Sequence, residues 1–552
     1  LVPAQAQDKD DPALEQYFIA NAAYNRKLYP VAIAQFEDFL KANGNHPKAD
    51  LARRGLALSL YAMKQYDKAM PYLATLLSKP KLDKTIDRER LIMLQGQCLL
   101  NTGKKDEARK LFTEQLNNVK TASFKTAALA AICDVSFAKS EWDKVIEWTA
   151  KLASSRPKPD QAARGLYQRG FAYYQTEKAK EATDALGQVA KLETSPAWKT
   201  LAAYLRGECH VILKEYDKAE PAFAEALPGL TGIDANECLY QLGLTRFLLK
   251  KYEEAQKDFE TYLKQAKPGD PNKKPNKGRK KNPNATGQPG AHIDEAKFYL
   301  ARCLLELEDY RAADKRFSEV AVGNDLIAAK ATLWWGRNYS RRNDYKRSAE
   351  ILGESIKRFN NSPVIDEIEF DYANALMAIK EPEWKQAATA LSHIEKRNKF
   401  GQMAEVIAQR ATCLHKLKDY TNSLSATNDF ISKFADHALA GDARFLKGEN
   451  LFLLNKGDEA ATAYTEFIKA NKEHPNVFAA NMRIAQVHHN AKRWDKALAS
   501  AGPLLAKKPE GRLFIQLSFV VGDCYFRQEK WQESIKPLED FVNERVILKN
   551  GK

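Results

Sequence analysis

The chain has 552 residues, of which 44% are hydrophobic and 28% charged, and its formal net charge is +15. That balance is typical of a soluble folded protein, and the absence of any run of about 18 apolar residues excludes a membrane-spanning helix. The positive charge favours acidic partners or anionic surfaces but does not choose between them.

Residues 1–11 form a polar tail that we expect to be processed or disordered. Within it, Ala4, Gln5 and Ala6 show the small-x-small pattern that ends a secretory signal, and the first residue is not Met. We therefore expect a periplasmic or secreted protein, and the alternative is an arbitrary boundary with a cytoplasmic location. Pro12 is well placed to start the first helix.

From residue 12 onward one pattern recurs fourteen times, in steps of 35–39 residues with a single step of 58. Its centre is a turn position, usually Tyr or Trp, as at Tyr216. A small residue lies nine positions earlier, as at Gly207, and another lies three positions later, as at Ala219; only Val145 breaks this rule. The turn positions are Tyr29, Tyr66, Lys105, Trp142, Ala179, Tyr216, Tyr252, Tyr310, Tyr345, Trp384, Tyr420, Gly457, Trp494 and Trp531.

This pattern predicts two short antiparallel helices per repeat, with the second helix opening at the turn position. Small residues such as Gly207 and Ala219 would let the two backbones touch while bulky neighbours fill the remaining space. The sequence therefore predicts an all-α fold built as a linear array, in which length gives no domain count.

Segments such as 243–255 and 448–460 carry the small and turn residues in fixed phase and resemble the tetratricopeptide repeat (TPR) family. The resemblance implies a right-handed superhelix, an α-solenoid of about fourteen helix-turn-helix repeats. Repeats one to seven would occupy 12–267, and repeats eight to fourteen would occupy 291–545. The usual step of 37 residues exceeds the family's period of about 34, which implies longer helix ends or inter-repeat turns.

The endings of the second helices indicate which members of this family the chain resembles. Phe36 and Phe39, and later Tyr464 and Phe467, stand three residues apart near the end of a repeat. Such endings are similar to those of bacterial envelope members of the family, among them the Tol–Pal coordinator and the outer-membrane assembly lipoproteins. The same spacing is also compatible with plain core packing.

An insertion at 268–290 separates the two halves of the array. It holds six positive charges, one negative charge and no large apolar residue, so burial cannot offset the entropy of ordering it. We expect a flexible loop that is either a solvated linker or a basic contact for anionic lipid, polysaccharide or nucleic acid. Nucleic acid is disfavoured because no aromatic residues are interleaved with the cations. A short tail is expected at 546–552.

The seven cysteines follow the repeat. Most lie two residues after the small residue of a first helix, which predicts small buried apolar slots. Cys209 and Cys238 lie in facing first helices of adjacent repeats and are the best candidates for a disulfide, which the sequence leaves open. The cysteines in the shared phase are Cys98, Cys209, Cys303, Cys413 and Cys524.

Motifs for catalysis are absent from the sequence. It contains no Gly-x-x-x-x-Gly-Lys-Ser/Thr loop, no His-Glu-x-x-His, no Gly-x-Ser-x-Gly and no Cys-x-x-Cys. His488 and His489 point to different sides of one helix, so they lack the i, i+4 geometry that zinc prefers. We therefore expect a protein that is not an enzyme, with no catalytic residues, cofactor or metal.

In the TPR family the first helices line a concave groove, and the resemblance assigns positions near the small residue to its lining. In repeats eight to eleven these positions are rich in cations. We interpret them as a patch that grips carboxylates of an acidic peptide or protein, and the alternative is ordinary solvated charge. The patch consists of Arg302, Lys330, Arg337, Arg341, Lys380 and Lys416.

A second candidate groove feature is a ladder of aromatic residues three positions before the small residue in four consecutive repeats. Tyrosine there is also the family's usual choice for packing, so the ladder is either core or a stacking surface for an extended peptide. Its members are Tyr167, Tyr204, Tyr240 and Phe298.

These observations favour a non-enzymatic scaffold that binds peptide or protein partners in the concave groove of a TPR superhelix and organises a bacterial envelope assembly. The alternative is binding of an anionic envelope polymer or membrane surface through the basic loop at 268–290. The identity of the partner and the oligomeric state stay open.

Overall fold

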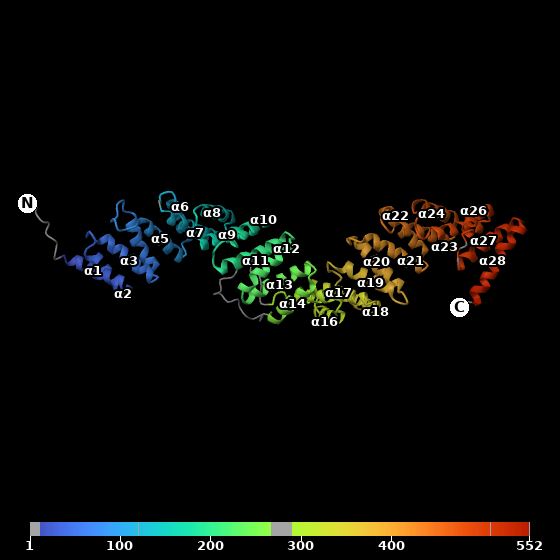
Figure 1. Ribbon diagram of the computed structural model, residues 1–552, viewed down its shortest axis with the longest axis horizontal. Helices are drawn as coiled ribbons and strands as arrows, with labels where there is room; N and C mark the ends of the chain where they lie inside the picture. The colour runs from blue at the N-terminus through green and yellow to red at the C-terminus, as the bar shows by residue number, and fades with distance from the viewer. Residues whose placement is uncertain (1–10, 120, 267–289, 508, 510, 551–552) are drawn as a thin grey trace, which may run out of the picture. The chain divides into compact units, whose positions relative to one another are not determined.

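The computed structural model describes residues 11–119, 121–266, 290–507, 509 and 511–550, with side chains up to residue 543. Over these residues the chain forms 28 α-helices and one short 3₁₀ helix, Leu227–Gly229, and has no strand. The predicted all-α fold is confirmed, and the helices follow one another as pairs along the chain (Figure 1).

The chain divides into two compact units, Leu1–Ala291 and His292–Lys552. The first unit contains α1 (Pro12–Asn25), α2 (Tyr29–Ala42), α3 (Ala49–Ala62), α4 (Tyr66–Leu77), α5 (Arg88–Asn101), α6 (Lys105–Gln115), α7 (Ala122–Ala138), α8 (Trp142–Ser154), α9 (Pro159–Gln175), α10 (Ala179–Val189), α11 (Pro196–Ile212), α12 (Tyr216–Ala226), α13 (Gly232–Leu248) and α14 (Tyr252–Gln265). The second unit contains α15 (Ile293–Glu306), α16 (Tyr310–Val320), α17 (Leu326–Arg341), α18 (Tyr345–Ile356), α19 (Ile365–Ala378), α20 (Trp384–Arg397), α21 (Met403–Lys416), α22 (Tyr420–Lys433), α23 (Ala440–Leu453), α24 (Gly457–Ala470), α25 (Val477–Asn490), α26 (Trp494–Leu505), α27 (Gly511–Arg527) and α28 (Trp531–Asn550).

Two expectations fall outside the described residues. They are the signal-like pattern at 4–6 and the basic segment 268–290, of which only residue 290 is described. At the other end, α28 continues to Asn550, so most of the expected tail at 546–552 is helical, in keeping with its Leu and Lys residues. Among the described helices, none combines the length and apolar character needed to cross a bilayer.

The turn inside each pair has a repeated geometry. Every predicted turn position is the first residue of a second helix, and two residues earlier φ is positive in every pair except α19 and α20, where Pro382 holds this place. In α11 and α12, Lys214 has φ of 58° and the Glu215 N–H donates to the His210 carbonyl at 2.9 Å. This Schellman-type closure reverses the chain.

The small residue of the first helix accommodates a large side chain of the second. A Cβ on Gly207 would lie 2.6 Å from the Phe223 ring, and a Cβ on Gly448 would lie 2.5 Å from the Tyr464 ring. We expected the two backbones to touch at this point. Instead, the side chain seven positions after the turn position fills the space in front of the small residue, and at Gly207 and Gly448 this space is open because glycine has no Cβ.

The core lies between the helices of each pair and between neighbouring pairs. The largest fully buried side chains include Phe36, Phe112, Phe223, Phe317 and Tyr464. Consecutive first helices also contact each other directly, as α9 with α11 and α17 with α19, whereas consecutive second helices among the described elements do so to a lesser extent. Within each unit the first helices therefore form the tighter, inner side.

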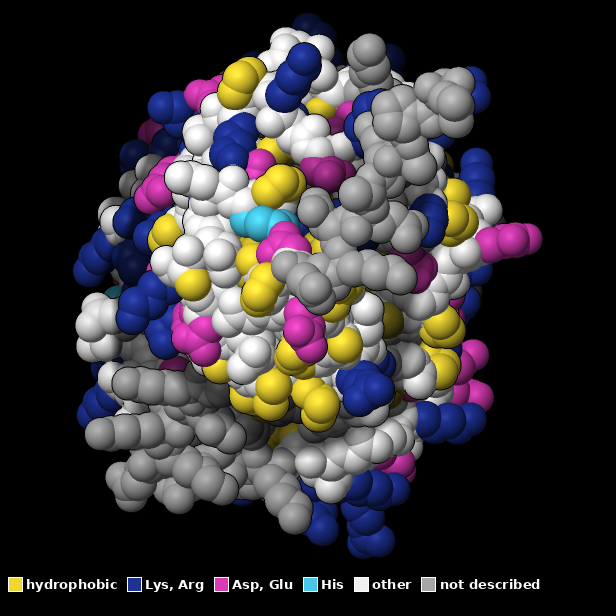
Figure 2. All heavy atoms as spheres, turned by 90° about the vertical axis from the view of Figure 1, so that its left-hand side faces the viewer, with side chains coloured by type: hydrophobic (Ala, Val, Ile, Leu, Met, Phe, Trp, Pro, Cys, Tyr) yellow, Lys and Arg dark blue, Asp and Glu magenta, His cyan; other side chains and the backbone are white. Residues whose placement is uncertain are grey.

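The first pair keeps one apolar face uncovered by any other described helix. Phe18 and Ile19 on α1, Leu28 in the turn and Val31 on α2 are each about half exposed, at 54%, 52%, 51% and 50%. Figure 2 looks onto this end and shows hydrophobic side chains gathered there.

All seven cysteines are buried, and none of them forms a disulfide. The Cys238 thiol donates to the Phe223 carbonyl at 3.4 Å instead of bonding to Cys209. Burial raises the pKa of both thiols to about 12, with Glu208 adding to the effect. The predicted buried slots are confirmed, and the structure has no disulfide between Cys209 and Cys238.

Gly207→Ala and Gly187→Ala form a matched pair of variants, since both glycines lie inside helices but a Cβ on Gly187 would meet nothing within 4 Å. Alanine favours a helix over glycine by about 1 kcal/mol at either place, whereas overpacking costs about 1–3 kcal/mol. We expect Gly187→Ala to stabilise its pair and Gly207→Ala to be less stable than that variant by about 1–3 kcal/mol. Native-state hydrogen exchange measures the effect in the pair that carries each change, α9 and α10 for Gly187→Ala and α11 and α12 for Gly207→Ala, and protection that rises equally in the two cases would contradict the packing role of Gly207.

The cysteines give a second prediction. A thiol reagent added to native, unreduced protein should react slowly, because all seven thiols are buried and the reagent cannot reach them. After unfolding without reductant, the reagent should titrate all seven thiols of the chain. A count of five would show that one disulfide exists.

Candidate functional site

Three of the six predicted cations come together on α15 and α17, around the indole of Trp334. The Cζ atom of Arg302 lies 3.3 Å from the centroid of the Trp334 ring, and that of Arg337 lies 4.6 Å from it. Guanidinium groups so placed are attracted by the ring's electrons and stack on its face. The tryptophan therefore holds two arginines in fixed positions.

Carboxylates of neighbouring helices form ion pairs with two of the three arginines, Arg337 and Arg341. Arg337 Nε donates to Asp371 Oδ2 on α19 at 2.5 Å, and the two terminal nitrogens of Arg341 donate to Glu306 on α15 at 3.2 and 3.1 Å. Burial raises the pKa of Asp371, and the Arg337 charge opposes that rise. The surface is thus a set of ion pairs with a small excess of positive charge rather than a uniformly basic patch.

Arg337 keeps unused donor capacity. Its side chain is 32% exposed, and only Nε hydrogen-bonds to a described residue. A guanidinium has five N–H donors, so both terminal nitrogens remain available for a ligand. Because Asp371 and Trp334 already fix the group, little conformational entropy would be lost when it binds.

Two adjoining clefts share Arg337 and Asp371, and we call them together the Arg337 cleft. The larger has a volume of about 870 Å³ and lies between α17, α19 and the turns at 360–363 and 399–402. The smaller, of about 550 Å³, continues along α17 and α19 past Trp334 and Arg341. Both volumes are in the range of ligand-binding sites.

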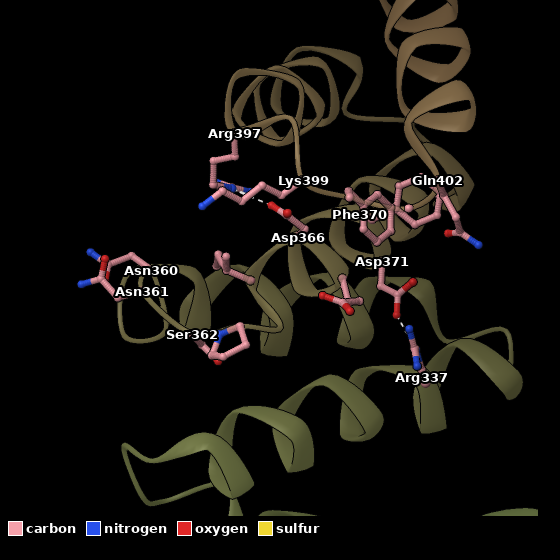
Figure 3. A pocket seen from close by; sticks show the side chains of 15 residues that line it. Arg337, Asn360, Asn361, Ser362, Asp366, Phe370, Asp371, Arg397, Lys399 and Gln402 are labelled. Carbon is pink, nitrogen blue, oxygen red and sulfur yellow. Dashed lines mark hydrogen bonds and ion pairs between the residues drawn. The ribbon is translucent and has the colours of Figure 1, made fainter. Parts of the chain in front are cut away.

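The wall of the larger cleft mixes polar and apolar groups. Figure 3 shows the Arg337–Asp371 pair on one side and the Arg397–Asp366 pair on the other, with Phe370 between them. The rings of Phe370 and Phe400 lie 5.2 Å apart and supply an apolar surface. This combination of fixed charges and apolar rings suits an extended peptide better than a small uncharged ligand.

The other three predicted cations lie elsewhere. Lys380 lines a third cleft of about 870 Å³ between α18 and the end of α19, which also contains Glu383 and shares Tyr345 with the smaller part of the Arg337 cleft. Lys330 and Lys416 line none of these three clefts. None of the three lysines has an ion pair with a described residue, so the structure does not gather all six cations at one site.

The aromatic ladder belongs to the core. Tyr167, Tyr204, Tyr240 and Phe298 are only 6%, 5%, 6% and 4% exposed. Tyr204 packs against Phe223 at a centroid distance of 5.8 Å, as part of the same contact that fills the space at Gly207. These rings present no open edge to a peptide, which corrects their assignment to the groove surface.

Sequence reasoning missed the residues that complete the site. Trp334 lies two positions before the small residue Gly336, and Asp371 lies four positions before Ala375 on the next first helix. The signal that could have found Asp371 is its helical spacing, which puts it on the inner side of α19 opposite Arg337. Nothing in the described residues gathers three or more His, Cys, Asp or Glu side chains around a possible metal.

Comparison with known families identifies repeats along the chain. One tetratricopeptide repeat model matches residues 19–83 and 445–509, and a second matches 237–267. No curated protein matches the sequence significantly. The narrower likeness to the Tol–Pal coordinator and the outer-membrane assembly lipoproteins is not tested by these matches and stays a prediction.

Solved structures overlap weakly with the chain. The C-terminal part of a TPR repeat-containing protein from Cytophaga hutchinsonii is 16% identical over 45% of this chain and 95% of its own, with a TM-score of 0.36. The Cut9–Hcn1 hetero-tetramer of the APC/C is 13% identical over 97% and 94%, with a TM-score of 0.28. The P58(IPK) TPR domain is 15% identical over 74% and 99%, with a TM-score of 0.23. At these scores the overlaps carry no inference.

The matched segments fall at both ends and in the middle of the array, and the pairs between them repeat the same small and turn positions. Residues 19–83, 237–267 and 445–509 are therefore tetratricopeptide repeats, set in an all-α array of helical pairs.

Proposed function

We propose that this protein is a non-enzymatic scaffold that binds acidic segments of partner proteins in the Arg337 cleft. TPR arrays serve in general as scaffolds for protein–protein interaction. The observation that carries the proposal is Arg337, which is fixed by Asp371 and Trp334 and still has two terminal nitrogens without a partner among the described residues.

The chemistry of Arg337 favours a carboxylate as its ligand. A guanidinium binds a carboxylate through two parallel hydrogen bonds, and each charge-assisted bond is stronger than one between neutral groups. The Nε–H already serves Asp371, so a ligand carboxylate would take the terminal nitrogens that face the clefts. The exposed Lys399 on the rim adds a second positive charge for a neighbouring acidic residue.

The rest of the cleft would hold the peptide chain. Asn360 and Gln402 offer side-chain amides at the rim of the larger cleft, and Phe370 and Phe400 offer an apolar surface. An acidic segment that also contains an apolar residue would use both features. The bacterial envelope setting is a further part of this proposal, and it is supported only by the likeness of the second-helix endings.

Charge-neutralising variants test the proposal with a fluorescent, N-acetylated octapeptide of alternating Asp and Glu. Arg337→Gln should weaken binding by about tenfold, since it removes a charge-assisted hydrogen-bonded pair. Asp371→Asn should strengthen binding, because a competing carboxylate is removed. Fluorescence anisotropy at low ionic strength measures both effects.

Arg316→Gln is the matched control. Arg316 lies on α16 in the same unit, pairs with Glu319 at 3.0 Å and lines none of the three clefts. Its substitution changes the net charge equally and should leave the affinity within about twofold, as expected for a partly exposed ion pair. If Arg337→Gln and Arg316→Gln weaken binding to the same degree, general charge attraction explains the binding and the proposed site is wrong.

A further inference from the structure

The position directly before the small residue of a first helix is an arginine in three pairs, and two of these arginines have a carboxylate partner. Arg206 on α11 donates to Glu225 on α12 at 2.6 Å, and Arg410 on α21 donates to Glu395 on α20 at 3.1 Å. The third is Arg169 on α9, which forms no ion pair with a described residue. The three equivalent places can therefore be compared.

The two positions that supply these carboxylates are neutral around Arg169. Glu225 lies nine positions after the turn position of its own pair, and Gln188 holds that place for Arg169. Glu395 lies eleven positions after the turn position of the preceding pair, and Ala153 holds that place. The chain thus keeps the arginine here and lacks both of the glutamates that neutralise it elsewhere.

A cleft lies where those carboxylates are missing. It has a volume of about 120 Å³, and Arg169, Gln188 and Ala153 all line it, together with apolar residues such as Leu152 and Leu166. Among the described residues of its wall, Arg169 is the one charged group. The short side chain of Ala153 leaves space that a glutamate would occupy.

The guanidinium of Arg169 is held in place from one side. Its Nε–H donates at 3.1 Å to the hydroxyl of Thr149, a residue that is 1% exposed and that donates in turn to the Val145 carbonyl at 2.7 Å. Both terminal nitrogens of Arg169 have no hydrogen bond to a described residue. Burial lowers the pKa of Arg169, and the groups that oppose this effect are Tyr173 and Cys133 rather than a carboxylate.

These features select the kind of ligand. A partly buried charge without a counter-charge is unfavourable, so an anion that entered the cleft would gain from pairing with Arg169. Sites for cofactors and drug-sized ligands measure about 300–1,000 Å³, so this cleft has room only for a small ion or a single side-chain group. Two oxygens of one oxyanion match the two terminal nitrogens of a guanidinium.

We propose that Arg169 and Gln188 bind one small oxyanion, a carboxylate or a phosphate, in the cleft between α8, α9 and α10. The anion takes the place of the glutamates that partner the other two arginines. The exposed Gln188 uses one N–H of its amide on the Asp184 carbonyl at 3.3 Å and can donate the second N–H to the anion. This site lies in the first unit and is separate from the Arg337 cleft, so it goes beyond the function proposed above.

The test uses three small probes that each carry a methyl group: acetate, methylphosphonate and acetamide, which is the neutral analogue of acetate. Saturation-transfer NMR titrations measure their affinities for the full chain carrying Arg337→Gln, so that the Arg337 cleft does not contribute and its own test stays independent. The tighter oxyanion should bind about tenfold more strongly than acetamide, because its hydrogen bonds to Arg169 are charge-assisted. Whether that oxyanion is acetate or methylphosphonate decides between a carboxylate site and a phosphate site.

Variants assign the binding to this cleft. Arg169→Gln should remove it, since the guanidinium is lost. Gln188→Glu should weaken it by about tenfold, because an internal carboxylate then pairs with Arg169 as Glu225 pairs with Arg206. Gln175→Glu is the matched control, since it makes the same change of charge at an exposed residue of α9 that does not line the cleft, and it should leave the affinity within about twofold.

Three results would overturn the proposal. One is acetamide binding as tightly as either oxyanion. Another is unchanged oxyanion binding in Gln188→Glu while far-UV circular dichroism shows a folded chain, which an exposed position should allow. The third is an equal loss of affinity in Gln188→Glu and Gln175→Glu, because the charge of the whole surface would then explain the binding.

Discussion

One contact inside each helical pair governs the rest of the structure. A large side chain of the second helix occupies the space in front of a small residue of the first, as Phe223 does at Gly207 and Tyr464 does at Gly448. Because the contact is specific in shape, it fixes both the rotation of the first helix about its axis and the height at which the second helix packs. The residue with positive φ two positions before the second helix closes the turn with the same geometry in every pair except α19 and α20, and this geometry also fixes the register of the two helices.

A fixed register has a consequence for chemistry. The residue directly after the small residue contacts a neighbouring first helix in several pairs, as Arg337 does through Asp371 of α19 and Glu449 does through Arg483 of α25. At Arg337 this position carries a guanidinium with free terminal nitrogens, and at Arg169 the position directly before the small residue carries another one beside a cleft. In repeat proteins the side chains that face a ligand can vary while the residues that pack the repeats stay the same.

The sequence was sufficient to predict the helical pairs and the turns inside them. Small and aromatic residues recur at a fixed spacing, and each predicted turn position is the first residue of a helix. It could also place Arg337 on the inner side of a first helix. It could not show that Asp371 would bind Arg337, since that contact joins different repeats and depends on how they stack. The burial of Tyr204 could not be predicted for a similar reason. A tyrosine at this position of the repeat can either pack in the core or contact a ligand, and the sequence alone does not distinguish the two.

A double-mutant cycle at Gly448 and Tyr464 tests the central contact most directly. Gly448→Leu should destabilise α23 and α24 by overpacking, and Tyr464→Ala should destabilise them by leaving a cavity. In the double variant the leucine can fill the space that the tyrosine leaves, so the free energy of unfolding should recover by at least about 1 kcal/mol over the sum of the single changes. Strictly additive losses would contradict the account, because they would mean that the two positions do not share one space.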